Sequence, residues 1–279
     1  NTAFSIVPVV FITNEVFRNI RGESIEKLAK DILAGLDLNV AMPPAKSNAS
    51  LALPVPVSLW SGGKPTEWQI DCDWTKSTQG RYFQFLREFK QLLGEATKLS
   101  VTIRLHQFLN QKIQGVPPAD RGVLMAYNVG ELDDPTAANT ILDTSITASY
   151  LRPDISYPIS LDLALPYYQW GRIYRDGELL YLSNELTADE LNDERFNLNT
   201  DGTYTTLRTT YLRGYSLYSG DMIRLEGSKP KELLSAARQL RIIPGFPGQR
   251  LLFYHIGSSM GQTCDDQLIR QIANSVAMR

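Results

Sequence analysis

The order of apolar runs along the chain constrains the fold most. Runs rich in β-branched and other apolar residues alternate with segments of helical period. This alternation is typical of a parallel sheet whose strands are joined by crossover helices. Barrels of this kind commonly reach about 250 residues as one domain, and the chain has 279. The sequence therefore predicts a single α/β domain over residues 1–279, built as a TIM-type barrel.

The clearest strand and helix lie together near residue 80. The strand "EWQIDCDW" leads through "TKSTQG" into a helix with a wide apolar stripe, which Gly94 ends. Further strands are expected at "FSIVPVVFITNEVF", "KLSVTIRLHQF", "RGVLMAYNVG", "YPISLDLALPYY" and "QRLLFYHIGSS". Further helices are expected from Ser24 to Leu36, from Asp143 to Leu151, from Lys231 to Leu240 and after a cap at Thr263.

Two departures from a regular barrel are expected. The residues before Glu67 are too few for three full βα units, so the barrel is predicted to be incomplete or irregular. Between residues 183 and 227 the pattern breaks into alternating Tyr, Thr and Leu around the pair Asp201-Gly202, which indicates a β-hairpin. Residues 183–227 are therefore predicted to be an insertion within the barrel.

The charge and the apolar runs exclude several classes of partner. A net charge of −2 without a Lys/Arg cluster argues against nucleic acid. No apolar run reaches the roughly 18 residues that span a bilayer. The chain begins at Asn1 rather than Met, which fits either a processed or a trimmed N-terminus; on the first alternative we expect an exported protein of the periplasm or cell envelope. The oligomeric state is left open.

Two aspartates at the end of a buried strand are the strongest functional signal. Side chains alternate along a strand, so Asp71 and Asp73 share one face, while Cys72 and Trp74 share the other. Active sites of barrel enzymes lie at the carboxyl ends of the strands. Asp71 and Asp73 are thus predicted to be catalytic, with Asp73 as the acid. A buried ion-pair network that only fills the barrel is the alternative.

Other strand ends carry polar residues that could join the same pocket. Arg104 is the natural charge partner for Asp71 or Asp73. The substrate-binding residues predicted from these ends are Arg104, His106, Tyr127, Asn128, Asp162, Trp170 and Tyr254. Glu15 and Asp162 are candidates for a second carboxylate, and Trp60, Trp74, Trp170 and Tyr168 for stacking on sugar rings. Tryptophans lie in the core more often than against sugars, so only one or two of the four are expected to stack on a sugar. For both histidines a place in the core or beside the site is at least as good an interpretation as catalysis.

Metal and nucleotide cofactors are not expected. The two histidines, His106 and His255, lack the spacing of a metal site, and Cys72 and Cys264 are interpreted as buried thiols. No glycine-rich nucleotide loop and no nucleophile elbow is present in the sequence. We therefore predict no cofactor and no metal.

Five segments in order resemble strands four to eight of the family 18 glycoside hydrolases, the chitinase-like barrels: "WQIDCDW", "LSVTIRL", "LMAYNVG", "ISLDLALPYYQWG" and "LLFYHIG". The match covers roughly residues 67 to 177 and the last strand. The segments "DCDW" and "RLHQ" also resemble a bacterial barrel family of uncharacterised function. The resemblance implies a TIM barrel that acts on a glycan.

The chain departs from the family pattern at two positions. Asp71 and Asp73 match the family's two aspartates, but Thr75 stands where the family has its proton-donating glutamate. Asn128 stands where the family has an aspartate that orients the substrate's acetamido group. The leading prediction is a glycoside hydrolase-like protein with a saccharide ligand; the alternative is an inactive barrel that binds a saccharide or a protein partner.

Overall fold

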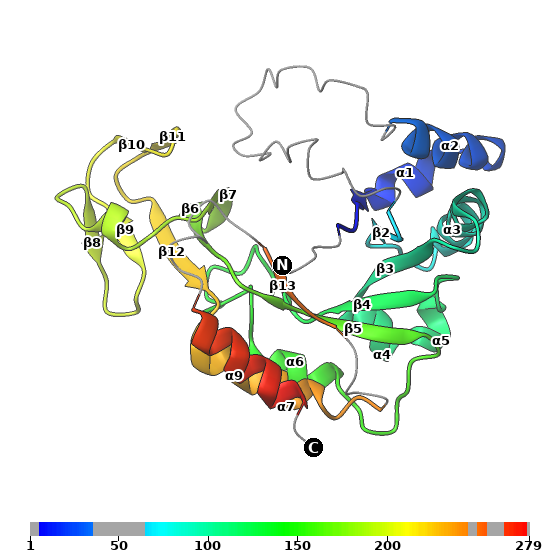
Figure 1. Cartoon of the computed structure of the whole chain (residues 1–279). Coiled ribbons are helices and arrows are strands. Elements are labelled where there is room, and N and C mark those ends of the chain that lie inside the picture. Colours follow the sequence, from blue (N-terminus) through cyan, green and yellow to red (C-terminus); the bar gives the residue numbers. More distant parts are fainter. Residues whose placement is uncertain (1–5, 36–64, 245–249, 256–264, 278–279) are drawn as a thin grey trace. The chain divides into compact units, whose positions relative to one another are not determined.

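The computed structural model describes residues 6–35, 65–244, 250–255 and 265–277 (Figure 1). Contacts between Cα atoms divide the chain into two compact units. The first contains Asn1–Leu124 and Tyr157–Asp162, and the second contains Met125–Ser156 and Leu163–Arg279. The predicted organisation as one domain over residues 1–279 stays a prediction.

The first unit is built on parallel strands. β1 (Val9–Phe11) pairs in parallel with β2 (Glu67–Asp71), and β2 pairs in parallel with β3 (Lys98–Arg104). β4 (Arg121–Met125) follows β3 in the sheet. The helical elements of this unit are α1 (Asn14–Asn19), η1 (Gly22–Ser24), α2 (Ile25–Gly35), α3 (Gln79–Leu93), α4 (Leu105–Leu109) and α5 (Gln111–Gln114).

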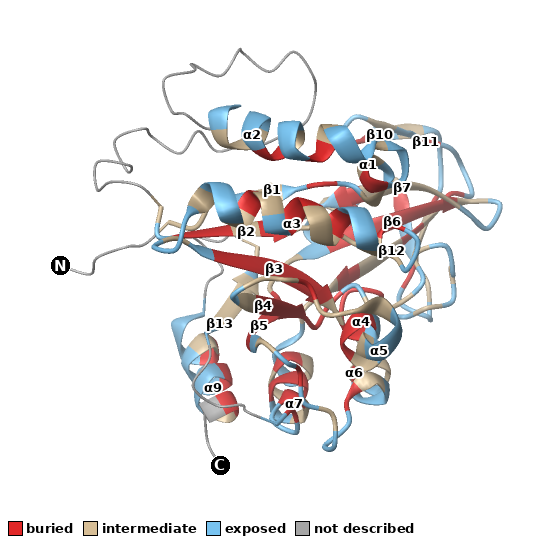
Figure 2. Cartoon of the chain, turned by 90° about the vertical axis from the view of Figure 1, so that its right-hand side faces the viewer, coloured by how far each residue is buried: buried red, intermediate tan, exposed pale blue. Residues whose placement is uncertain are grey.

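Helix α3 covers one face of these strands because its apolar side chains recur at helical spacing. Tyr82, Phe85, Leu86 and Phe89 are all buried, and Figure 2 shows α3 with both buried and exposed parts along its length. The ring of Phe89 packs edge-on against Trp68 of β2, with 5.8 Å between the centroids. Gly94 ends the helix with φ of 77°, a left-handed conformation that favours glycine. The predicted helix and its stop are confirmed.

The second unit contains the end of the parallel strand order and a group of helices. β5 (Ser160–Pro166) belongs to the first unit up to Asp162 and to the second from Leu163, and it pairs in parallel with β13 (Leu251–Tyr254). The helices are α6 (Thr144–Tyr150), α7 (Pro230–Leu240) and α9 (Asp266–Ala277), and α7 packs against both α6 and α9. The Asp143 carboxylate accepts hydrogen bonds from the backbone N–H groups of Ser145 and Ile146, so it caps α6. The cap predicted for the last helix, Thr263, lies outside the described residues.

An antiparallel sheet forms the rest of the second unit. Its order is β7-β6-β12-β9-β8, and β10 pairs separately with β11. The strands are β6 (Gln169–Arg175), β7 (Glu178–Asn184), β8 (Phe196–Leu198), β9 (Tyr204–Thr206), β10 (Thr210–Leu212), β11 (Tyr215–Leu217) and β12 (Met222–Gly227), with the short helix η3 (Asp189–Leu191) between β7 and β8.

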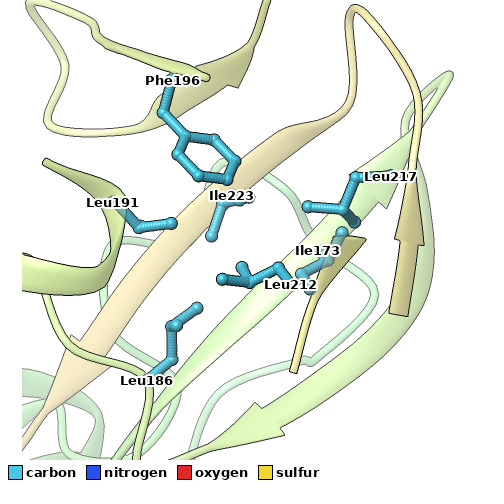
Figure 3. Packing of buried hydrophobic residues seen from close by; sticks show 7 residues of the cluster. All are labelled: Ile173, Leu186, Leu191, Phe196, Leu212, Leu217 and Ile223. Atoms are coloured by element: carbon cyan, nitrogen blue, oxygen red, sulfur yellow. The ribbon is translucent and has the colours of Figure 1, made fainter. Parts of the chain in front are cut away.

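The antiparallel sheet agrees with the predicted hairpin and extends it. β8 and β9 are antiparallel neighbours that flank Asp201-Gly202, as the sequence indicated. The antiparallel strands begin at Gln169, upstream of the insertion boundary predicted at residue 183. One face of this sheet carries its own apolar core, in which Ile173, Leu186 and Ile223 are buried together (Figure 3).

The strand order β1-β2-β3-β4-β5-β13, interleaved with helices, confirms an α/β fold of the incomplete barrel type. A complete barrel has eight parallel strands, and this order contains six among the described residues. Every helix among the described residues is too short or too polar to cross a lipid bilayer.

Two predicted strands are shorter than expected. The first was expected to continue to Phe17, but helix α1 begins at Asn14. Glu15 therefore lies on an exposed helix rather than at a strand end, and its carboxylate bonds Asn19 (2.6 Å) and Arg18 (3.4 Å). The strand at "KLSVTIRLHQF" ends at Arg104, because helix α4 begins at Leu105.

Candidate functional site

The carboxylate site, defined by Asp71, Asp73, Thr102 and Arg104, lies at the carboxyl ends of two neighbouring strands of the first unit. Asp71 is the last residue of β2, and Asp73 follows two residues later. In a strand, residues two apart are separated by about 6.6 Å along the chain and point to the same side. The parallel register of β2 and β3 brings Thr102 and Arg104 beside them.

Arg104 binds Asp73 through a bidentate ion pair. Its Nε donates to Oδ1 at 2.6 Å and its Nη2 donates to Oδ2 at 2.7 Å. This parallel geometry is the strong form of an arginine–carboxylate contact. The sequence predicted Arg104 as a partner of Asp71 or Asp73, and the structure selects Asp73. Both carboxylate oxygens of Asp73 are therefore engaged.

Asp71 lies in a different environment from Asp73. Its Oδ1 accepts a hydrogen bond from the Thr102 hydroxyl at 2.6 Å. Burial raises the pKa of the Asp71 carboxyl above its usual value, the Thr102 hydrogen bond opposes that shift, and the nearby charge of Asp73 adds to it. Asp71 therefore holds its proton to a higher pH than an ordinary aspartate.

The raised pKa of Asp71 predicts a pH-dependent stability. A carboxyl whose pKa is higher in the folded state stabilises that state fully below its ordinary pKa, and this contribution is lost as the pH rises through the folded value. Asp71→Asn carries no charge, so we expect its free energy of unfolding to rise relative to wild type as the pH is increased from about 3 to 7. Each tenfold difference in proton affinity between the folded and unfolded states corresponds to about 1.4 kcal/mol.

Urea unfolding of both proteins across this pH series measures the difference directly. A difference between Asp71→Asn and wild type that stays constant from acid to neutral pH contradicts the raised pKa of Asp71.

The opposite face of the same segment is core. Cys72 is fully buried, and burial raises the pKa of its thiol to about 12. Trp74 is 1% exposed and stacks on Tyr82, and its indole N–H donates to the backbone oxygen of Gln114 at 2.9 Å. Trp74 therefore has no ring face available for a sugar, which corrects that prediction. Trp60 lies outside the described residues.

The burial of Cys72 predicts slow alkylation. Thiolate is the reactive form of cysteine, and a buried thiol of high pKa supplies very little of it. Iodoacetamide at pH 8 should leave the Cys72 peptide unmodified in the folded protein and modify it completely in urea. Peptide mass spectrometry, with the urea sample as the control, measures both. Rapid modification of Cys72 without urea would show that the strand end is open.

Thr75 supports the start of helix α3. Its backbone N–H donates to the Thr78 hydroxyl at 3.0 Å, and its own hydroxyl lies 3.0 Å from that of Ser77. Thr75 therefore takes part in the turn before the helix. A hydroxyl has no acidic proton in the range where a glycosidase works.

His106 occupies the first turns of α4, not the strand face shared by Thr102 and Arg104. Gln107 accounts for this change of direction: its side chain accepts from the Arg104 backbone N–H at 2.8 Å and donates to the Trp74 backbone oxygen at 2.9 Å. His106 is exposed, yet its pKa responds to Asp73 and Arg104. The largest effect is desolvation of the imidazole by neighbouring protein atoms, which lowers that pKa and favours the neutral imidazole.

Asp162 is the fifth predicted residue in the first unit. Its side chain is fully buried, and Oδ1 accepts from Arg121 Nη1 at 2.7 Å. A buried carboxylate held this way is ordinarily structural.

The remaining predicted residues lie in the second unit. Tyr127 and Tyr254 stack with 5.2 Å between ring centroids and 7° between planes. Tyr168 packs edge-on against both rings and against Trp170, and stacks on His255. We call these five side chains the aromatic cluster. Tyr254 is 47% exposed, whereas Tyr127 and Trp170 are buried.

Asn128 lies beside the aromatic cluster in a left-handed conformation, with φ of 53°. Its side-chain oxygen accepts a hydrogen bond from the Tyr168 hydroxyl at 2.5 Å. Asparagine tolerates this conformation better than most residues.

Each unit thus brings part of the predicted set together. The first holds Asp71, Asp73, Arg104, His106 and Asp162, and the second holds Tyr127, Asn128, Trp170 and Tyr254. Their convergence on one pocket stays a prediction. Thr102, the hydrogen-bond partner of Asp71, was not among the site residues predicted from the sequence.

A buried ion pair beneath Trp170 was not predicted. Glu226 pairs with Arg172, and the side chains of both residues are fully buried. Its carboxylate also accepts from the Trp170 indole N–H at 2.9 Å and from the Thr140 hydroxyl at 2.6 Å. An alternating strand pattern carries no signal for such a pair, because β6 and β12 are far apart in sequence.

Within the part of the chain that the structure describes, no group of three His, Cys, Asp or Glu side chains is arranged to hold a metal ion.

No protein-family model and no curated protein sequence matches this chain. Among solved structures, it is similar to the Bacillus cereus spore cortex-lytic enzyme SleL, with 13% identity, a TM-score of 0.45 and coverage of 98% of this chain and 60% of that one. It is also similar to a Rhizomucor miehei chitinase, with 10% identity, a TM-score of 0.45 and coverage of 97% of this chain and 84% of that one. A third similar structure is a glycoside hydrolase family 18 N-acetylglucosaminidase from Paenibacillus barengoltzii, with 9% identity, a TM-score of 0.40 and coverage of 97% of this chain and 98% of that one. The chain thus spans less than two thirds of the length of SleL, and family 18 enzymes are among its structural matches.

Proposed function

We propose that the chain hydrolyses a glycosidic bond at the carboxylate site, with Asp71 as the proton donor. One observation carries the proposal: two carboxyl groups at the same strand end have different environments. Burial raises the pKa of Asp71, whereas Arg104 binds both oxygens of Asp73. Glycoside hydrolysis commonly uses one protonated and one ionised carboxyl group. Environment sets these two roles in known enzymes.

The sequence predicted Asp73 as the acid. We assign that role to Asp71 instead. An acid must carry a proton, and the bidentate ion pair with Arg104 requires Asp73 to be ionised. In the proposed reaction Asp71 gives its proton to the glycosidic oxygen as the bond to the anomeric carbon breaks. A water molecule adds to that carbon and releases a proton to the Asp73 carboxylate. Proton exchange with solvent then restores both groups.

Further contacts to a saccharide are proposed within each unit separately. Arg104 and the neutral imidazole of His106 lie close to Asp73 and offer hydrogen-bond donors to sugar hydroxyls. Tyr254 is the exposed ring of the aromatic cluster and suits stacking on a pyranose face. Four further residues stay predicted to bind substrate: Tyr127, Asn128, Asp162 and Trp170.

Export to the cell envelope also stays a prediction.

Saccharide binding without turnover is the second candidate. Two observations favour it: Thr75 is engaged in the turn before α3, and Arg104 occupies both oxygens of Asp73, the second carboxylate of the carboxylate site. In that case Asp73 and Arg104 would bind hydroxyl groups, and Asp71 would carry out no chemistry.

Incubation with a panel of oligosaccharides separates the two candidates. The panel contains β-linked N-acetylglucosamine and β-linked glucose oligomers, and products are measured by mass spectrometry for wild type, Asp71→Asn and Asp73→Asn. Hydrolysis predicts shorter products from wild type and their loss with Asp71→Asn. Saturable binding by wild type without any shorter product would reject hydrolysis in favour of binding alone.

A further inference from the structure

A pocket of about 780 Å³ lies on the antiparallel sheet of the second unit. Its lining includes Pro135, Ala138, Tyr174, Asp201, Met222 and Arg224. Its volume falls in the range of about 300 to 1,000 Å³ typical of small-molecule sites. None of these residues belongs to the carboxylate site or to the aromatic cluster, so neither proposal above uses this pocket.

The pocket lies on the sheet face opposite the apolar core. Ile223 of β12 points into that core together with Ile173 (Figure 3). Because side chains alternate along a strand, Met222 and Arg224 point to the other face. The antiparallel register places Arg224 opposite Arg172 and Met222 opposite Tyr174. The floor of the pocket is therefore formed by neighbouring side chains of β6 and β12.

The charges on this face do not balance around Arg224. Two like charges directly opposite each other on neighbouring strands repel. Glu226 compensates Arg172, with which it forms the fully buried ion pair. The acidic partner of Arg224 is Asp201, which is 56% exposed and 3.5 Å from Nη2. An exposed pair at that distance contributes little, so Arg224 retains positive charge toward the pocket.

The guanidinium of Arg224 is also incompletely hydrogen-bonded. A guanidinium carries five N–H donors. The side chain of Arg224 is only 12% exposed, and its buried Nε has no hydrogen-bond partner among the described residues. Because Nε has no accessible surface, a ligand in the pocket would be bound by the Nη groups, of which Nη2 makes the 3.5 Å contact with Asp201.

We infer that this pocket binds a small organic carboxylate with an apolar body, held by Arg224. A carboxylate matches the planar fork of a guanidinium. Pro135, Ala138, Met222 and the ring of Tyr174 provide apolar walls for the rest of the molecule. Asp176 and Asp201 are exposed parts of the lining and repel anions away from Arg224, a dianion more strongly than a monoanion. A single carboxylate is therefore favoured over phosphate.

Benzoate, benzamide and inorganic phosphate test this inference on the full chain. Methionine is labelled with ¹³C at its methyl group, and the Met222 resonance is assigned with Met222→Leu. We expect benzoate to shift the Met222 resonance saturably, while benzamide, its uncharged counterpart, and phosphate do not. No shift with benzoate, or an equal shift with benzamide or phosphate, would overturn the inference without the use of any binding-site variant.

Arg224→Gln tests the role of the guanidinium in the same titration. We expect the dissociation constant for benzoate to rise at least about tenfold, the size of a lost charge-assisted contact. Arg208→Gln is the matched control, because Arg208 is an exposed arginine of the same unit, paired with Glu194. Thermal unfolding confirms that both variants fold. Unchanged affinity in folded Arg224→Gln, or an equal loss in Arg208→Gln, would overturn the assignment to Arg224.

Discussion

Replacement of Asp71 by asparagine is expected to reduce kcat for the oligosaccharide that wild type cleaves by about 10²- to 10⁴-fold. This is the usual contribution of a positioned proton donor. Asparagine keeps the shape of the side chain and can still accept the 2.6 Å hydrogen bond from Thr102, but it has no acidic proton. KM should change little, because the loss concerns the transition state. Initial rates over a range of substrate concentrations separate the two constants.

Two further variants make this result specific. Asp31→Asn removes an exposed carboxylate of the first unit, paired with Lys27 on α2, and should retain wild-type kcat. Thr102→Val removes the hydrogen bond that lowers the pKa of Asp71, so that pKa should rise further and the pH at which the rate falls, as Asp71 loses its proton, should move higher. Equal activity of Asp71→Asn and wild type would remove Asp71 from the mechanism.

Replacement of Arg172 by methionine is expected to lower the free energy of unfolding by about 3 to 5 kcal/mol. Arg172 and Glu226 form a fully buried ion pair, and removal of one partner leaves the other charge uncompensated in the interior. Arg172 also donates to the backbone oxygens of Leu132, Asp134 and Ala137, so the loop before α6 loses its attachment to β6. Urea unfolding measures the loss.

Two controls accompany Arg172→Met: replacement of an exposed arginine, and replacement of both members of the buried ion pair. Arg208→Gln removes an exposed ion pair and should change stability by less than about 1 kcal/mol. Replacement of both Arg172 and Glu226 by uncharged residues should cost less than the sum of the two single changes, because no unpaired charge remains. If Arg172→Met unfolds at the wild-type urea concentration, the buried ion pair does not hold the second unit together.

The features that the sequence predicts well are those set by local periodicity. The apolar stripe from Tyr82 to Leu93 and the glycine after it identify α3 almost to the residue. Strand alternation also placed Asp71 and Asp73 on one face and Arg104 beside them. These features follow from the 3.6- and 2-residue periods of helix and strand, which do not depend on distant contacts.

The features that it misses depend on contacts between distant segments. The pattern of Thr102, Arg104 and His106 continues a strand, but the strand ends because Gln107 bonds both Arg104 and the Trp74 backbone. Helix α1 starts where Asn14 accepts a hydrogen bond from Thr78 at 2.5 Å, another contact across the fold. The different environments of the two aspartates could not be predicted from sequence, because they depend on burial of Asp71 and on the choice of Asp73 as partner by Arg104.

A carboxyl titration tests most directly whether Asp71 holds its proton beside an ion-paired Asp73. The full chain is labelled with ¹³C at the aspartate side-chain carboxyl, the Asp71 resonance is assigned with Asp71→Asn, and its chemical shift is followed from about pH 2 to 8, a range that spans the ordinary aspartate pKa. We predict a midpoint above the ordinary value of 3.8 that rises further in Thr102→Val. A midpoint at or below 3.8 would contradict the assignment of Asp71 as the proton donor.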